Sequence, residues 1–282
     1  MKTHYKIPKA SVIIVNYNNA KYLGDCINSI LKQSYKNKEI IVVDDKSKDK
    51  SHKVLKKFKK EIIIINNKKK TTEGSYNQIN SYYNGYIKSK GDYLFFLDSD
   101  DYFKKNKIEL IIKTFENNKK IDLIFDLPIF KYKKKEVKKK FKQKKFIISS
   151  WPRFTPQSCI SVRKNFAKEI FKELKVKKFE TIWLDFRIAV YYFLKKKRIH
   201  IFKKYLTYYR QLDNSASKKY KILSKNWWYR RKQGHEFVSF VNKKLKLKDN
   251  NNFDKTLTKI INFFLNEKNT HNRNKKFYWF KS

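Results

Sequence analysis

Short apolar runs alternate with amphipathic segments through the first hundred residues of the chain. The runs at 11–15, 39–43, 62–65 and 93–97 are continuous enough to be buried strands. The segments between them repeat apolar residues every three or four positions, which predicts helices. Strands that alternate with helices predict an α/β fold, a mostly parallel sheet with helices on both faces. Ligands bind such sheets beyond the carboxyl ends of the strands, so the polar residues there are the candidates for chemistry.

The pattern changes after residue 120. Further strands are predicted at 121–125, 129–132, 146–148 and 158–162, and helices at 166–174 and 182–194. The segment 199–210 reads as a strand or a hairpin, and the chain beyond about 216 as basic helices. One apolar stripe in the last part repeats at helical spacing, and we expect it to dock onto the main domain: Leu257, Ile260, Ile261, Phe264 and Leu265.

An acidic cluster follows the apolar run 93–97. Asp98, Asp100 and Asp101 stand within four positions, and carboxylates this close repel one another by roughly 1 kcal/mol in water and by more where water is scarce. A cation relieves that repulsion, and oxygen ligands select a hard ion such as Mg²⁺ or Mn²⁺. The alternative is a helix cap, because acidic residues favour helix starts and a helix is expected near 108–115. Asp101 suits either role.

Two other predicted strands end in weaker signals. Asp44 and Asp45 close the run 39–43, where acidic residues also serve as turn caps. The first strand runs into Asn16 and Tyr17, whose amide and ring could bind and stack on a base. The carboxyl ends of parallel strands meet at one edge of a sheet, so an aromatic residue, an acidic pair and a metal-type cluster are expected there together.

Taken as a set, these segments resemble family 2 glycosyltransferases in order and spacing. The resemblance is dense over 10–118 and patchier to about 217, and the matching segments are 11–18, 29–34, 39–47 and 91–101. It implies a GT-A fold, which is a Rossmann-like, mostly parallel sheet flanked by helices. It also implies transfer of a sugar, with inversion, from a nucleotide-diphosphate sugar to an acceptor hydroxyl. Surface polysaccharide or glycan assembly is the expected setting.

The resemblance also implies roles for individual residues. Val15 and Tyr17 line the nucleoside pocket and Asp45 faces the base. Asp44 supports the turn, and Asp98 lies near the ribose. The metal is held on the diphosphate through the DxD motif, with the ligands Asp100, Asp98 and, if it is not a cap, Asp101.

The remaining roles fall in the second half of the chain. Asp185 is expected as the catalytic base, with Glu180 as the second choice, because an acidic residue at a helix start takes the acceptor proton. The alternative for Asp185 is a surface pair with Arg187 or a simple cap. Arg210 is expected near the donor diphosphate. The chain departs from the family pattern at four positions: Val15 for Pro, Lys46 for Gly, Tyr82 for Arg and Leu212 for His.

The domain boundaries follow from the same comparison. We predict a GT-A domain over 1–217, made of a nucleotide-binding half at 1–118 and an acceptor half at 119–217. A basic helical extension occupies 218–282. A non-catalytic sugar-nucleotide-binding or scaffold protein with a membrane-associating basic tail is the alternative function. A nucleotidyltransferase is disfavoured because no Gly-rich triphosphate loop follows the first strand.

The net charge of +45 suggests a polyanionic partner, but only eight of the 70 basic residues are Arg. Phosphate recognition favours Arg, and no zinc-ligand or helix-turn-helix spacing is present, so nucleic acid is not expected as a partner. Cys26 and Cys159 fit buried thiols. No apolar run reaches the ~18 residues of a membrane span, which favours a cytoplasmic location. The aromatic and basic run 227–232 suggests a peripheral contact with the inner face of the cell membrane, and with it a glycan or lipid-linked glycan acceptor. The alternative is that Trp227 and Trp228 belong to the core where the tail docks onto the main domain.

Overall fold

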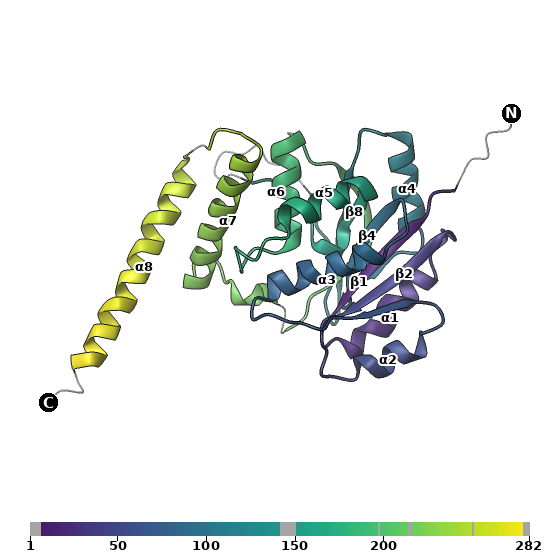
Figure 1. The fold of residues 1–282 in the computed structure, drawn as a ribbon, viewed down its shortest axis with the longest axis horizontal. Coiled ribbons are helices and arrows are strands. Elements are labelled where there is room, and N and C mark those ends of the chain that lie inside the picture. Colours follow the sequence, from purple (N-terminus) through teal and green to yellow (C-terminus); the bar gives the residue numbers. More distant parts are fainter. Residues whose placement is uncertain (1–6, 142–150, 197, 214–215, 250, 279–282) are drawn as a thin grey trace.

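The computed structural model describes residues 7–141, 151–196, 198–213, 216–249 and 251–278, without the side chains of 216–217 and 266–278. Figure 1 shows a twisted sheet with helices on both faces and two long helices to one side of it. The α/β class predicted from the sequence is confirmed. The strand expected at 146–148 lies outside the described residues.

The first half alternates strands and helices as predicted. Its strands β3, β2, β1 and β4 are neighbours in that order and all run parallel. The elements are β1 (Ala10–Asn16), α1 (Ala20–Leu31), β2 (Lys38–Asp44), α2 (Ser51–Lys57), β3 (Ile63–Asn66), α3 (Gly74–Lys88), β4 (Tyr93–Asp98), β5 (Tyr102–Phe103) and α4 (Lys107–Asn117).

The second half continues the same sheet in mixed directions. β8 lies antiparallel between β4 and β6, and β9 runs parallel to β6 and also pairs with β5. Among the described residues the sheet therefore has nine strands. The elements are β6 (Leu123–Lys131), β7 (Glu136–Lys138), the 3-10 turn η1 (Gln157–Cys159), β8 (Ile160–Arg163), α5 (Lys164–Leu174), α6 (Leu184–Lys196), β9 (Ile201–Arg210) and η2 (Ala216–Lys219).

One of the sequence predictions for this half needs correction. The separate strands expected at 121–125 and 129–132 form one strand, β6. Pro128, which lacks a backbone N–H, sits where the pairing register between β6 and β9 shifts, so the irregularity accommodates it without ending the strand. Of the two alternatives for 199–210, a strand or a hairpin, the structure has the strand, β9.

Both faces of the sheet are buried, which explains why its central strands read as continuous apolar runs. Along β1, Ile13 faces a core shared with α3, α5, α6 and α7. Its neighbours Val12 and Ile14 face a second core shared with α1, α2 and α4. A sheet covered in this way exposes its strand ends, and polar side chains can gather there.

The C-terminal helices α7 (Lys225–Lys244) and α8 (Phe253–Tyr278) stack outward from the body, α7 against α6 and α8 against α7. The expectation that the apolar stripe of α8 docks inward holds for only part of it. Leu257, Ile261 and Leu265 are half-buried, whereas Ile260 and Phe264 are 49% and 58% exposed. The buried positions described on α8 are polar: Asp254, Lys255, Thr258 and Asn262. Polar contacts fix this orientation, because Arg231 pairs with Asp254 and Asn262 donates to the Trp228 carbonyl.

Among the described residues, none of the helices combines the length and the apolar character that a membrane span requires. Cys26 and Cys159 are both free and buried, as the sequence predicts.

Candidate active site

Three adjacent strands bring the sequence-predicted residues to one edge of the sheet. The register pairs Asn16 at the end of β1 with Asp44 at the end of β2. On the other side of β1, Val15 pairs with Asp98 at the end of β4. The carboxyl ends of the three strands are thus level, and the loops that leave them share one rim, as the parallel-sheet argument requires.

Asp44 organises the turn after β2. Its buried carboxylate accepts hydrogen bonds from the Asn16 amide (2.7 Å), the Ser47 backbone N–H (2.9 Å) and the Ser47 hydroxyl (2.6 Å). Lys46 within this turn has a φ of 61°, a left-handed conformation that glycine adopts more easily. Lys46 is the position where the family pattern has Gly, so the turn keeps its shape although the residue differs.

Asp45, Tyr17 and Val15 lie around the same rim. The Asp45 carboxylate is buried and accepts from the Asn67 amide at 2.9 Å. Lys70 reaches over both, with its ammonium 3.6 Å from the Asp45 carboxylate and 2.9 Å from the centre of the Tyr17 ring. Tyr17 is 45% exposed and Val15 is half-buried. Lys70 was missed from the sequence, because one Lys in a Lys-rich loop carries no signal.

Asp98 is held at the end of β4 by helix α3. One carboxylate oxygen accepts from the Tyr82 hydroxyl at 2.9 Å and from the Gln78 amide at 3.2 Å. Burial, with the charges of Asp100 and then of Asp185, raises the pKa of Asp98 to about 7, although the hydrogen bonds from Tyr82 and Gln78 oppose the rise. Tyr82, at the position where the family has Arg, therefore donates a hydrogen bond to the acidic cluster through its hydroxyl. The influence of Asp185 places that residue within electrostatic reach of Asp98.

Asp101 is fully buried, and each of its carboxylate oxygens has a partner. One accepts from the Ser158 hydroxyl at 2.6 Å, and the other accepts from the Arg210 backbone N–H at 2.8 Å. The helix-cap alternative for Asp101 is wrong, because β5 intervenes and α4 begins at Lys107 with Asn106 as its cap residue. Asp101 instead ties the loop after β4 to the second half of the chain.

Arg210, at the end of β9, lies directly on this loop. Its guanidinium donates to the Asp100 carbonyl at 2.7 Å and to the Asp25 carboxylate at 2.9 Å. It also stacks on the rings of Tyr22 and Tyr102, 5.0 and 4.7 Å from their centres. Burial raises the pKa of Asp100, and the positive charge of Arg210 lowers it. Arg210 therefore holds the backbone of the loop and is the nearby positive charge that partly offsets the acidic cluster.

Asp185 and Glu180 approach from the acceptor half. Asp185 is in the first turn of α6, where it accepts from the Phe186 N–H at 2.7 Å. Burial raises the pKa of Asp185, and the charge of Arg230 opposes the rise. Glu180 is exposed and accepts from the Tyr229 hydroxyl at 2.9 Å. Of the two, Asp185 is the carboxylate that interacts electrostatically with Asp98.

Arg187 does not pair with Asp185 at the surface, so that alternative is wrong. Its side chain is fully buried, and burial lowers its pKa to about 10, which still leaves it charged at neutral pH. The guanidinium holds the loop before α6 by donating to the backbone carbonyls of Leu174, Val176, Lys178, Phe179 and Ile182.

A buried ion pair beneath the site was also missed from the sequence. Lys107 and Asp126 are fully buried and 2.7 Å apart. The Lys107 ammonium also donates to the Ser158 carbonyl (2.8 Å) and the Thr207 hydroxyl (2.7 Å). Through this one ammonium group, α4 is bonded to β6, β9 and η1. The only sequence signal was one acidic residue inside the apolar run of β6. The pair fixes Ser158, which in turn supports Asp101.

The carboxylates offer few free oxygens to a metal. Among the described residues there is no group of three or more His, Cys, Asp or Glu side chains arranged to hold an ion. Asp101 uses both oxygens within the protein, and Asp98 uses one. The Asp100 carboxylate has its own backbone as a hydrogen-bond donor. These few free carboxylate oxygens cannot complete the coordination of an ion by themselves. They fit Mg²⁺ or Mn²⁺, which proteins bind through one or two carboxylates together with substrate phosphates.

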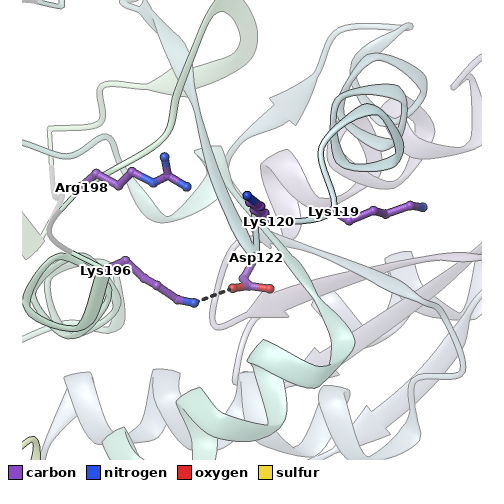
Figure 2. A pocket seen from close by; sticks show the side chains of 5 residues that line it. All are labelled: Lys119, Lys120, Asp122, Lys196 and Arg198. Atoms are coloured by element: carbon purple, nitrogen blue, oxygen red, sulfur yellow. Dashed lines mark ion pairs between the residues drawn. The ribbon is translucent and has the colours of Figure 1, made fainter.

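A basic hollow of about 560 Å³ lies away from these carboxylates. Figure 2 shows its lining, in which the Lys196 ammonium is 3.5 Å from the Asp122 carboxylate. Asp122 directly precedes β6 and its carbonyl accepts from Arg163, which pairs with the first residue of β4. The hollow is therefore at the opposite edge of the sheet from Asp98, and we place the chemistry at the carboxylates. The rest of its lining is Lys119, Lys120 and Arg198.

A sequence profile described as glycosyl transferase family 2 matches residues 11–175, more than half of the chain. The chain belongs to this family. The resemblance read from the sequence is thereby confirmed, and the matched segment contains the three strand ends and Asp98 to Asp101.

Curated relatives within family 2 match only part of their length. An uncharacterized glycosyltransferase of Nostoc sp. is 32% identical over 121 residues, which are 43% of this chain and 37% of that protein. Glycosyltransferase GlyG of Streptococcus pneumoniae is 38% identical over 101 residues, 36% of this chain and 33% of its own. An uncharacterized glycosyltransferase of Mycoplasma genitalium is 31% identical over 180 residues, which are 59% of this chain and 57% of that protein. The chain thus covers less than two thirds of each.

Solved structures agree on the fold. Crystal structures of S. aureus TarS residues 1–349, in complex with UDP and with UDP-GlcNAc, match 81% of this chain with TM-scores of 0.55 and 0.54. The match covers 65% and 66% of those chains at 18% sequence identity. This likeness confirms the predicted fold class, a GT-A type sheet flanked by helices, with helices at the C-terminal end.

Proposed function

We propose that this family 2 protein is an inverting glycosyltransferase that moves a sugar from a nucleotide-diphosphate sugar to an acceptor hydroxyl. The observation that carries the proposal is the meeting of two carboxylate sets from different halves of the chain. Asp98 and Asp100 lie at and just beyond the end of β4 in the nucleotide-binding half. Asp185 lies in the first turn of α6 in the acceptor half, near enough for its charge to raise the pKa of Asp98. A donor at the first set would present its sugar to a base at the second.

The rim of β1 and β2 suits the donor nucleoside. Tyr17 offers a half-exposed ring for stacking, with Val15 beside it and the Asp45 carboxylate to face the base. Asp98 would lie near the ribose. Arg210 borders the place of the diphosphate, although its guanidinium already binds Asp25 and the Asp100 carbonyl. That TarS was solved with UDP and UDP-GlcNAc supports a nucleotide-sugar donor for this chain as well.

A divalent cation, Mg²⁺ or Mn²⁺, is part of the proposal. Asp100 would hold it with the free oxygen of Asp98, whereas Asp101 supports the loop through Ser158 and Arg210. When bound, the cation would neutralise charge on the departing nucleoside diphosphate. A site made of so few protein oxygens is completed by the donor phosphates.

Asp185 is the proposed base. As the acceptor oxygen bonds to the anomeric carbon and the bond from that carbon to the diphosphate oxygen breaks, the acceptor proton passes to the Asp185 carboxylate. Attack on the face opposite the leaving group inverts the anomeric centre. Partial burial suits the role, because it raises the pKa of Asp185 toward that of an effective proton acceptor. Glu180, exposed and bonded to Tyr229, is the weaker candidate.

The proposed setting is surface polysaccharide or glycan assembly at the cytoplasmic face of a membrane, with a glycan or lipid-linked glycan as acceptor. The alternative is a sugar-nucleotide-binding or scaffold protein without turnover. The departures from the family at Tyr82 and Leu212 favour that alternative, since the usual Arg and His are replaced.

The test is hydrolysis and transfer with a panel of nucleotide sugars, with Mn²⁺ or with a chelator, on the full chain. We expect one donor to be turned over only with the cation, and Asp100→Asn to lower turnover by about 10²-fold or more. Asp122→Asn, at the far edge of the sheet, is the matched control and should keep full activity. Turnover that survives Asp100→Asn contradicts the metal assignment. Donor binding without any turnover, seen as a thermal shift, favours the scaffold alternative.

A further inference from the structure

Helix α8 forms the outermost layer of the molecule. Figure 1 shows it on the far side of α7, away from the sheet, and α7 is the element on which it packs. Its outward face is therefore a surface, and the side chains described there are unusual for one. Phe253 is 77% exposed, and Ile260, Phe263 and Phe264 are between 49% and 60% exposed.

These apolar residues form a stripe. Phe253, Ile260 and Phe264 recur at intervals of seven and four residues, which places them on one side of a helix. The buried Asp254, Thr258 and Asn262 repeat every four residues and lie on the side toward α7. Ordinary amphipathic helices turn their apolar side inward. On α8 the apolar residues divide: Leu257, Ile261 and Leu265 are half-buried, whereas Phe253, Ile260 and Phe264 are exposed and are left for a contact outside the chain.

Two further exposed apolar residues closely precede α7. Asn262 donates to the Trp228 carbonyl, so this part of α8 lies level with the first turn of α7. Ile222 and Leu223, just before α7, are 79% and 67% exposed. Leu223 keeps that exposure with a φ of 65°, which is unusual for a branched side chain.

Charge identifies the occupant. Downstream of the stripe the helix is basic in sequence, with Lys268, Arg273, Lys275 and Lys276 against the single acidic Glu267. On the described part, Asp254 is already paired with Arg231. Two copies of a chain of net charge +45 would repel each other across such a face, whereas an anionic surface would attract it.

An apolar stripe with basic surroundings is the pattern of a helix that lies in the plane of a lipid interface. We infer that the outer face of α8 binds the surface of an anionic lipid bilayer, with Phe253, Ile260 and Phe264 entering the acyl boundary and the positive charge of the chain attracting the anionic headgroups. The sequence-level expectation placed this contact at 227–232. In the structure Trp227 and Trp228 are half-buried and pack on each other, and Arg231 lies over the Trp227 ring.

The test is co-sedimentation of the full chain with vesicles of phosphatidylcholine alone or mixed with phosphatidylglycerol. Wild type should partition onto the mixed vesicles, and Phe253→Ser/Ile260→Ser/Phe264→Ser should bind them roughly 30-fold more weakly. The matched control, Ile7→Ser/Ile87→Ser, removes exposed apolar side chains elsewhere and should bind like wild type. Circular dichroism and thermal melting check that each variant is folded.

Several outcomes would overturn the inference. Equal binding by wild type and the triple variant would mean that the lysines alone carry the contact. Absence of binding to mixed vesicles by wild type would remove the lipid as partner. A dimer in sedimentation equilibrium that the triple variant dissolves, with lipid binding unchanged, would make the stripe an interface between copies. The readout is lipid binding, so the result is independent of whether the chain proves to transfer a sugar.

Discussion

Asp98, Asp100 and Asp101 follow one strand, but their hydrogen-bond partners separate them. Asp98 shares one oxygen between Tyr82 and Gln78, and Asp101 gives both oxygens to Ser158 and the backbone of Arg210. Asp100 is buried and has its own backbone as donor. A carboxylate that already accepts two hydrogen bonds at its two oxygens is a poor metal ligand. At the scale of the residue, the cluster divides into one carboxylate that supports the loop and two that we propose for the donor and its cation.

Asp185→Asn isolates the proposed base. The amide keeps the shape of the side chain but cannot take a proton, so we expect kcat to fall by about 10²–10⁴-fold while donor KM changes little. In wild type the raised pKa of Asp185 should shift the acid limb of kcat/KM above the pH at which an ordinary aspartate titrates. Initial rates across pH measure both. Glu180→Gln is the control, and a larger loss in that variant than in Asp185→Asn would make Glu180 the base.

At the scale of the element, a compact polar group holds α8 to α7 and to the body. His235 of α7 lies 3.1 Å from the Asp254 carboxylate, which also pairs with Arg231. The Trp151 ring covers both His235 and Arg231. Because these groups are buried between helices, the docking of α8 depends on the charge that each one carries.

His235 makes that docking pH-dependent. Burial, with the charges of Arg231 and Lys255, lowers the pKa of His235 to about 4, although the charge of Asp254 opposes the shift. The folded-state pKa is below the ordinary 6.5, so the neutral histidine stabilises the fold fully above pH 6.5. That stability is lost as pH falls toward 4, by up to about 3 kcal/mol.

Urea unfolding of wild type and His235→Gln, followed at intervals from pH 7 to pH 4, measures this effect. The free energy of unfolding should fall less steeply toward acid pH in the variant. His52→Gln, at an exposed position, is the matched control and should keep the wild-type slope. Parallel slopes in wild type and His235→Gln would show that the histidine has the same pKa in the folded and unfolded states, which contradicts the prediction.

At the scale of the whole molecule, the net charge of +45 acts on the compact state. Positive side chains spread over one folded surface repel one another, and the repulsion eases when the chain unfolds. The buried pairs, such as Lys107 with Asp126, involve only a few of these charges. This repulsion therefore destabilises the folded state of the whole molecule, and it cannot be assigned to any single residue.

Salt should relieve that strain. Raising NaCl from about 0.05 to 0.3 M shortens the screening length below the spacing of surface charges, so the free energy of unfolding should rise by on the order of 1 kcal/mol. Urea melts at each salt concentration give the value, with a sugar osmolyte as the uncharged control. A free energy that falls with salt would mean that attractive pairs outweigh the repulsion.

By itself, the sequence determined the alternation of strands and helices, the α/β class and the strand ends where chemistry gathers. It could do so because continuous apolar runs, helical spacing and the order of family motifs are local properties of the chain. The family membership rested on the same segments.

Tertiary structure decided the rest. It set the partners of Asp101, the burial of Arg187 and of the Lys107–Asp126 pair, the single strand across Pro128 and which part of the α8 stripe is exposed. Each of these depends on which groups from distant segments meet. A buried charge or a helix face is stabilised by partners far away in sequence, and spacing along the chain does not encode where those partners lie.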